Sequence, residues 1–233
     1  MAELFPIFLK LDGRKALVVG GGKMAAVRTK QLISAGARVT VVSPNAGSEI
    51  ERLAKTKSVV MVRRGFRRAD LSRRYFIVIA ATDDPKVQQA VFEAAERLGI
   101  LCNVVDSPAS CNFYMPAIVR RGDLKIAIST SGRSPALAGK LRQYLEEAMP
   151  ENAAELTEMV GRLRSKLRLE IPGDLATQKK LVDEFVEREL TKKRSGRDSR
   201  GALVAVQPYR PGRRPAGVRL GVAGGSKGVA FAR

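Results

Sequence analysis

A glycine-rich turn between two apolar segments constrains the fold of this chain more than any other feature. The apolar run at residues 16–19 stops at three glycines, and a segment with the apolar spacing of a helix then begins. Gly20, Gly22 and Ala25 fit the pattern Gly-x-Gly-x-x-Ala, in which the glycines allow a tight turn and a close approach of backbone to a pyrophosphate. Such a triplet can also be a simple tight turn. A second apolar run at 38–42 lies at the distance expected for a strand-helix-strand unit, which favours a dinucleotide-binding turn.

Apolar runs alternate with helical patterns through the first half of the chain. The runs predict strands at residues 16–19, 38–42, 58–62, 75–81 and 100–105, and the patterns between them predict helices at 23–35, 48–55 and 85–98. The run at 75–81 is continuously apolar, which is typical of a parallel strand buried on both faces. We therefore expect an α/β fold with a Rossmann-type, doubly wound parallel sheet. The apolar residues 4–11 are expected to pack as an extended arm on the sheet edge.

The alternation of strands and helices stops after Asp106. Residues 113–119 and 124–130 flank Arg120-Arg121-Gly122-Asp123 and predict a β-hairpin, and helices are expected at 135–149, 152–167 and 173–190. The predicted organisation is a dinucleotide-binding domain at 1–112, a hairpin-helix region at 113–149, a helical domain at 150–191 and a basic, disordered tail at 192–233.

The charge of the chain is strongly basic and unevenly distributed. The formal net charge is +19 over 233 residues, and about half of this excess lies in the segment 192–233. That segment is rich in Gly, Pro and Arg and has no helical or alternating period, which favours a solvated extension over an RNA-binding segment. The remaining chain is basic too, which favours an anionic ligand for the folded part.

The composition also excludes several kinds of site. The chain has no histidine, so histidine acid/base catalysis, Ser-His-Asp triads and His-ligated zinc or haem are excluded. Cys102 and Cys111 are nine residues apart, which fits neither a redox pair nor a zinc site and indicates buried, inactive thiols. No apolar run reaches the roughly 18 residues of a membrane span, and the N-terminus lacks a signal-peptide pattern, so we expect a cytoplasmic protein.

Polar residues follow the predicted strands at the edge where open α/β sheets hold ligands. Ser43-Pro44-Asn45 stands where NAD-binding folds usually carry an acidic residue on the ribose, so that rule does not decide between NAD and NADP. Thr82 and Asp83 end the fourth strand, and either Asp83 or Asp84 can cap the next helix. Asp106 ends the fifth strand, where it is either a base or substrate anchor or the cap of a turn.

Six ordered motifs together resemble the precorrin-2 dehydrogenase family, the dehydrogenase/chelatase portion of sirohaem synthases, over residues 4–190. They are Phe5-Pro-Ile-Phe-Leu, Val19-Gly-Gly-Gly-Lys-Met-Ala-Ala, Ala80-Ala-Thr-Asp-Asp, Cys102-Asn-Val-Val-Asp-Ser-Pro, Phe113-Tyr-Met-Pro-Ala and Ile128-Ser-Thr-Ser-Gly-Arg-Ser-Pro. The resemblance implies NAD-dependent oxidation of precorrin-2 to sirohydrochlorin, with ferrous-iron insertion to sirohaem in some members. It also implies a homodimer in which the regions after the Rossmann domain are exchanged between subunits.

The resemblance also assigns roles to individual residues. Asp106 matches the family's catalytic aspartate, and the motifs place the substrate near Asn103, Thr130, Ser131 and Gly132. The positions that contact the nucleotide are Lys23, Met24, Pro44 and Asn45, beside Gly20, Gly22, Ser43, Thr82 and Asp83. No metal-ligating residue is predicted, because the pyrrole nitrogens of the substrate are the destination of any iron.

One departure from the family pattern and several further expectations complete this interpretation. Met24 stands where a valine is common in the family. The uroporphyrinogen methylation carried by longer fused relatives is expected to be absent. The carboxylates of precorrin-2 are expected to dock on a basic cleft formed by Arg120, Arg121, Lys125, Arg133 and Lys140. The alternative function is a non-catalytic NAD(H)-sensing module, which would keep the glycine turn but needs neither Asp106 nor the loop 129–132.

Overall fold

The computed structural model describes residues 3–192. The predicted basic tail at 192–233 lies outside these residues, apart from Lys192, which ends the last helix. None of the helices within 3–192 is both long enough and apolar enough to cross a membrane.

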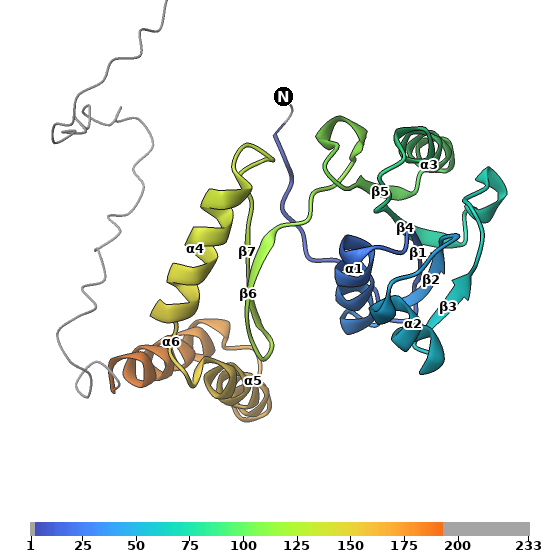
Figure 1. Cartoon of the computed structure of the whole chain (residues 1–233). Helices are drawn as coiled ribbons and strands as arrows, with labels where there is room; N and C mark the ends of the chain where they lie inside the picture. The colour runs from blue at the N-terminus through green and yellow to red at the C-terminus, as the bar shows by residue number, and fades with distance from the viewer. Residues whose placement is uncertain (1–2, 193–233) are drawn as a thin grey trace, which may run out of the picture. The chain divides into compact units, whose positions relative to one another are not determined.

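A parallel five-stranded sheet forms the first half of the described chain (Figure 1). Its strand order is β3-β2-β1-β4-β5, which confirms the predicted Rossmann-type fold. The elements are β1 (Lys15–Val19), α1 (Lys23–Ser34), β2 (Arg38–Val42), α2 (Ser48–Lys55), β3 (Val59–Val62), β4 (Tyr75–Ala80), α3 (Pro85–Leu98) and β5 (Leu101–Val104). The chain order reverses between β1 and β4, so their carboxyl ends border the crevice in which such sheets bind ligands.

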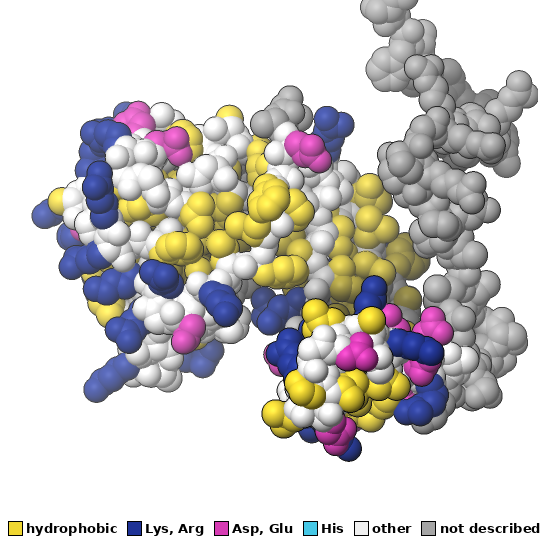
Figure 2. All heavy atoms as spheres, turned by 180° about the vertical axis from the view of Figure 1, so that it is seen from behind, with side chains coloured by type: hydrophobic (Ala, Val, Ile, Leu, Met, Phe, Trp, Pro, Cys, Tyr) yellow, Lys and Arg dark blue, Asp and Glu magenta, His cyan; other side chains and the backbone are white. Residues whose placement is uncertain are grey.

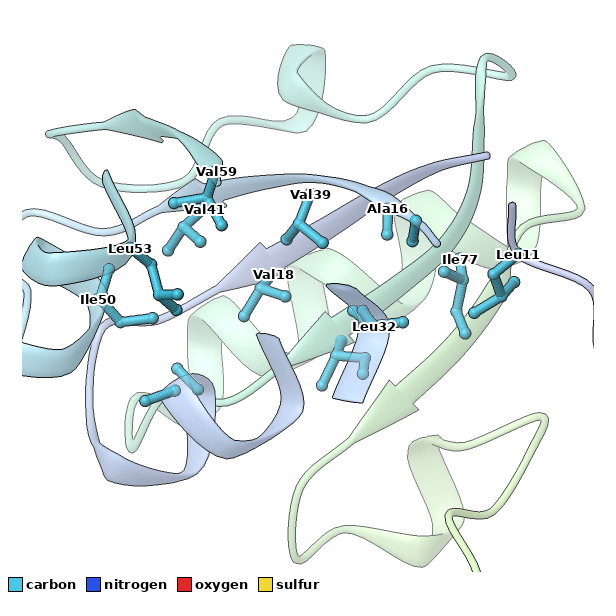
Figure 3. Packing of buried hydrophobic residues seen from close by; sticks show 14 residues of the cluster. Leu11, Ala16, Val18, Leu32, Val39, Val41, Ile50, Leu53, Val59 and Ile77 are labelled. Atoms are coloured by element: carbon cyan, nitrogen blue, oxygen red, sulfur yellow. The ribbon is translucent and has the colours of Figure 1, made fainter. Parts of the chain in front are cut away.

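Both faces of this sheet are covered by helices, because the strand side chains alternate between two cores. Ala16 and Val18 of β1 belong to a buried cluster that includes Leu32 of α1 and Ile50 of α2 (Figure 3). Leu17 and Val19 of β1 pack with α3 on the opposite face. The continuous apolar runs seen in the sequence are therefore strands buried on both faces.

A β-hairpin and three helices follow the sheet. β6 (Ala117–Arg121) and β7 (Leu124–Ile128) pair antiparallel around a turn at Gly122, whose φ of +57° is readily adopted by glycine. The helices are α4 (Pro135–Ala148), α5 (Ala153–Glu170) and α6 (Leu175–Lys192). These elements confirm the predicted hairpin and helices, although both strands are shorter than expected. The boundaries proposed for separate domains stay a prediction.

The N-terminal segment differs from the prediction. Residues 4–10 form no strand and are exposed, with Phe5 at 85% and Phe8 at 68% of full exposure. Only Leu11 enters the core. The reason is topological: the segment leads through the turn at Gly13 directly into β1, which has β2 and β4 on its two sides, so it does not run along an edge strand.

Candidate functional site

The glycine turn is held between the ends of two strands. The Gly20 N–H donates a hydrogen bond to the Val42 carbonyl at the end of β2, with an N–O distance of 2.9 Å. Beside it, the Ala81 N–H donates to the Val19 carbonyl at 2.8 Å. Gly20 has a φ of +119°, a conformation that L-residues with side chains rarely adopt. The turn is thus fixed at the crevice between β1 and β4.

The start of α1 is suited to an anion. Gly22 is its N-cap, no side chain caps the helix, and no acidic residue lies in its first turn. In contrast, Asp84 caps α3 and Ser134 caps α4 through side-chain oxygens. The first amide groups of α1 therefore lack an intrahelical acceptor and a side-chain acceptor, and the helix dipole adds positive potential there. A dinucleotide diphosphate fits this arrangement.

The other residues predicted to bind the nucleotide also lie at this edge of the sheet. Ser43 is buried and its hydroxyl donates to the Asn45 carbonyl at 2.6 Å, which shapes the loop. The Gly47 N–H in turn donates to the Gly21 carbonyl at 2.9 Å, so the loop after β2 is tied to the glycine turn. Exposed positions on the same edge are occupied by Lys23, Pro44, Asn45 and Asp83, while Thr82 is half-buried.

A cleft with a volume of about 320 Å³ lies next to this edge. Its walls come from α1, the chain after β5, the two open ends of the hairpin and the first turns of α4. The predicted site residues among those that line it are Met24, Asn103, Asp106, Thr130 and Gly132. Segments more than one hundred residues apart in the sequence thus meet around one space.

Asp106 lies in the turn directly after β5, with a φ of +61°. The residue is exposed to the cleft, and no hydrogen bond or ion pair within residues 3–192 uses its carboxylate. The alternative that Asp106 caps its own turn is therefore not what the structure shows. Its carboxylate is free to interact with a molecule in the cleft.

The predicted substrate residues are arranged unequally. Asn103 is buried and donates through Nδ2 to the Phe113 carbonyl at 3.0 Å, which fixes the segment leading to the hairpin. The Thr130 hydroxyl accepts a hydrogen bond from the Ser134 N–H at 3.1 Å, so it orders the loop before α4. Ser131 is exposed and does not line the cleft, although its neighbours Thr130 and Gly132 do.

The basic cleft expected from the sequence does not form within residues 3–192. None of its five residues lines the cleft. Arg120 and Lys125 are opposite each other in the backbone register of the hairpin, and Arg121 donates a hydrogen bond to the Glu146 carbonyl at 2.9 Å. Among the described residues, the cation that lines the cleft is instead Arg28, one helical turn after Met24. Sequence reasoning missed it, although the spacing of four residues from Met24 places both on one face of α1.

Burial and a nearby carboxylate act on Arg28 in opposite directions. Burial lowers the pKa of the Arg28 guanidinium, and the negative charge of Asp106 partly offsets this effect. Arg28 stays charged, because the ordinary pKa of an arginine lies far above neutral pH. The cleft therefore holds one positive and one negative side chain near each other.

The two cysteines behave as the sequence indicates. Burial raises the pKa of Cys102 to about 12 and raises the pKa of Cys111 as well, so both are thiols at neutral pH. Cys111 lines the cleft, but its sulfur is hydrogen-bonded to the backbone of Val104. Within residues 3–192, no three His, Cys, Asp or Glu side chains come together as a metal site.

Comparison with known proteins agrees with this geometry. Residues 7–117 match a family described as putative NAD(P)-binding, and residues 121–148 match the sirohaem biosynthesis protein central family. Siroheme synthase 1 of Aeromonas hydrophila is 37% identical over 177 residues, which cover 76% of this chain and 38% of the relative. Siroheme synthase of Methylococcus capsulatus is 41% identical over 170 residues, which cover 73% of this chain and 36% of the relative.

The solved structure of SirC, a precorrin-2 dehydrogenase, is similar over 82% of this chain and 96% of its own, with a TM-score of 0.67 and 28% identity. The chain spans little more than a third of the length of the curated relatives named above. The two matching family models follow one another along the chain. The chain therefore belongs to the family formed by the NAD(P)-binding and central regions of sirohaem synthases.

Proposed function

We propose that this protein catalyses the NAD-dependent oxidation of precorrin-2 to sirohydrochlorin. The observation that carries the proposal is that α1 joins two places: it begins at the glycine turn and its next residues line the cleft that holds Asp106. A dinucleotide on the turn and a substrate in the cleft would therefore be neighbours. The similarity to SirC, which is a precorrin-2 dehydrogenase, supports this substrate.

The nucleotide would be bound by the edge of the sheet. Gly20, Gly22 and the first amides of α1, including those of Lys23 and Met24, would hold the diphosphate. The loop Ser43-Pro44-Asn45 would contact the adenosine ribose, and Thr82 and Asp83 would border the crevice after β4. When bound, oxidised NAD supplies the hydride acceptor.

Asp106 is proposed as the group that receives the proton. Oxidation of the macrocycle removes a hydride and a proton, and the hydride goes to the nicotinamide. The Asp106 carboxylate has no partner within the described residues, and it is exposed, so it can accept a proton and pass it to water. Asn103, Thr130 and Gly132 would surround the substrate, with Ser131 at the rim.

The turnover assay tests this proposal directly. Purified protein with NAD and precorrin-2 should develop the absorbance of sirohydrochlorin, and NADP in parallel decides the coenzyme preference. Asp106→Asn should lower kcat by about 100-fold or more while NAD still binds. Asparagine is the best replacement because it tolerates the φ of +61°. Asp123→Asn, in the hairpin turn, is the matched control.

The outcomes separate the two candidate functions. If wild-type protein binds NAD but forms no sirohydrochlorin, the NAD(H)-sensing alternative is supported and the enzyme proposal fails. If sirohydrochlorin forms and Asp106→Asn keeps the full rate, the dehydrogenase stands but the role of Asp106 is wrong.

Iron insertion would use the same cleft. Ferrous iron is then a substrate whose final ligands are the pyrrole nitrogens, so the protein needs only a group that accepts the displaced protons. Asp106 is the carboxylate among the cleft-lining residues of the described chain. Sirohydrochlorin absorbance should fall when ferrous iron is added, and this loss should depend on Asp106. If added ferrous iron leaves the absorbance unchanged, iron insertion is excluded.

We also propose that the protein is a homodimer whose hairpin-helix regions are exchanged between subunits. Leu137, Leu141 and Tyr144 form a stripe on α4 that is 52%, 40% and 67% exposed. Figure 2 shows hydrophobic side chains gathered over a broad area of one face, with Lys and Arg around it. Exposed apolar area of this kind usually marks an interface.

Light scattering after gel filtration tests the dimer. Leu141→Glu places a charge in the stripe and should give a monomer. Gln143→Glu is the control, because this exposed polar residue lies on another side of the same helix. A monomeric wild-type protein, or a dimer that is unaffected by Leu141→Glu, would contradict this interface.

A further inference from the structure

Arg28 is a cation in the cleft to which the preceding proposal gives no role. It lies on α1 one turn after Met24, and both residues line the cleft. Among the described residues that form the cleft walls, Arg28 is the one positive side chain and Asp106 the one negative side chain. An anionic group of a molecule in the cleft would therefore find its positive partner at Arg28.

The guanidinium of Arg28 is only partly satisfied. Its Nη1 donates to Oε1 of Gln31 at 3.0 Å, but its Nε is buried and has no hydrogen-bond partner. A buried N–H group without a partner costs free energy, because it has lost water and gained no acceptor. An acceptor that reaches the edge formed by Nε and Nη2 would remove this cost.

The charge of Arg28 is also less compensated than that of three other arginines in the first half of the described chain. Arg63 pairs with Glu51, Arg64 with Asp70, and Arg68 with Glu93. No ion pair within 4.0 Å is formed by Arg28, although Asp106 is close enough to influence it. A half-buried charge without an ion pair is unfavourable in the ligand-free protein and is therefore expected where an anionic ligand completes the site.

We propose that Arg28 binds a carboxylate of the substrate inside the cleft, beside Asp106. This inference rests on the proposed function, because the substrate is then a polycarboxylate macrocycle. A guanidinium edge can form two parallel hydrogen bonds with a carboxylate, which fixes position as well as supplying attraction. Arg28 also counters the repulsion between the Asp106 carboxylate and the acidic side chains of the substrate. Because α1 begins at the glycine turn, one helix would align the two reactants.

The test measures binding of uroporphyrin, a fluorescent polycarboxylate macrocycle, separately from turnover. Arg28→Met should weaken uroporphyrin binding by about 10- to 100-fold, and Arg28→Lys should lose part of that affinity because it cannot form the paired bonds. Lys30→Met is the matched control: it removes a charge from the same helix, but Lys30 contacts Glu49 and does not line the cleft. NAD affinity should stay unchanged in all variants, since the glycine turn is intact.

Steady-state kinetics then separate this inference from the proposed function. In Arg28→Met, KM for precorrin-2 should rise by a similar factor and kcat should change less. Wild-type uroporphyrin binding and wild-type KM in this variant would overturn the inference and leave the dehydrogenase intact. A parallel loss of NAD affinity would also overturn it, because the role of Arg28 would then be structural.

Two further outcomes are informative. If wild-type protein fails to oxidise precorrin-2 but its uroporphyrin binding depends on Arg28, the proposed function fails and the carboxylate site stands. If Arg28→Met does not fold, Arg28→Lys decides, and unchanged uroporphyrin binding in that folded variant would refute the paired-bond geometry.

Discussion

A Cβ atom on Gly20 would lie 2.0 Å from the carbonyl oxygen of Ala81, far inside any real contact. Gly20 also has a φ of +119°. An alanine there would therefore be strained both by the overlap with Ala81 and by its backbone conformation. We expect Gly20→Ala to lower the free energy of unfolding by about 2–4 kcal/mol. Urea denaturation measures this change. Wild-type stability would show that the end of β4 does not close against the glycine turn.

Gly22 offers the opposite case two residues later. Its φ is −78°, and a Cβ atom there would have no atom within 4 Å, so alanine should change the free energy of unfolding by no more than about 1 kcal/mol. The added methyl group would instead occupy space needed by the diphosphate. We expect NAD affinity to fall by roughly tenfold or more while stability is kept. Titration of NAD by fluorescence checks this, and unchanged affinity would place the diphosphate elsewhere.

Most of the fold could be predicted because its signals are local. The five strands are short apolar runs, and the helices between them end at residues such as Gly99, whose φ is +65°. Asp84 and Pro85 mark the start of α3 by the same kind of local chemistry. Such signals do not depend on the rest of the chain. The predicted bounds therefore differ from the observed ones by only a few residues.

The parts that could not be predicted depend on contacts between distant segments. The apolar character of residues 4–10 did not reveal that they reach a central strand and stay exposed. The sequence does not distinguish Arg28 from other cations on helices, because the hairpin and α4 that complete the cleft lie about 90 or more residues later in the chain. Arg121 looked available for an anion, but α4 supplies the Glu146 carbonyl as its partner. The positions of Lys and Arg in the sequence therefore did not show which of these side chains would contact the ligand.

The pair of Arg64 and Asp70 should make stability depend on pH. Arg64 donates to Asp70 Oδ2 at 2.7 Å, and this hydrogen bond lowers the pKa of Asp70 below its ordinary value. A lowered pKa in the folded state contributes stability above the pKa of the unfolded state, about 3.9, and loses it as pH falls. Wild-type protein should therefore be more stable than Asp70→Asn at pH 6.

This difference should shrink as the pH falls below about 4. Urea midpoints at pH 6, 4 and 3 provide the measurement. Arg64→Met is the companion variant, because it removes the partner and should abolish the same part of the pH dependence. A wild-type advantage over Asp70→Asn that is equal at all three pH values would mean that the ion pair contributes nothing through titration.

The neighbouring Asp83 and Asp84 should affect different properties. Asp84 caps α3, since its Oδ1 accepts hydrogen bonds from the Lys86 and Val87 N–H groups at 2.9 and 3.4 Å. We expect Asp84→Ala to lower the free energy of unfolding by about 1 kcal/mol, the usual value of an N-cap. Asp83 is exposed at the crevice and makes no such bond, so Asp83→Ala should leave stability within about 0.5 kcal/mol.

NAD affinity should also distinguish Asp83 from Asp84. If Asp83 borders the nucleotide as proposed, Asp83→Ala should change NAD affinity at wild-type stability, whereas Asp84→Ala should change stability first. Thermal unfolding and NAD titration on the same preparations measure both properties. Loss of stability in Asp83→Ala, with Asp84→Ala unaffected, would reverse the assignment of the cap and move the start of α3. Unchanged NAD affinity in Asp83→Ala would remove that residue from the nucleotide site without affecting the glycine turn.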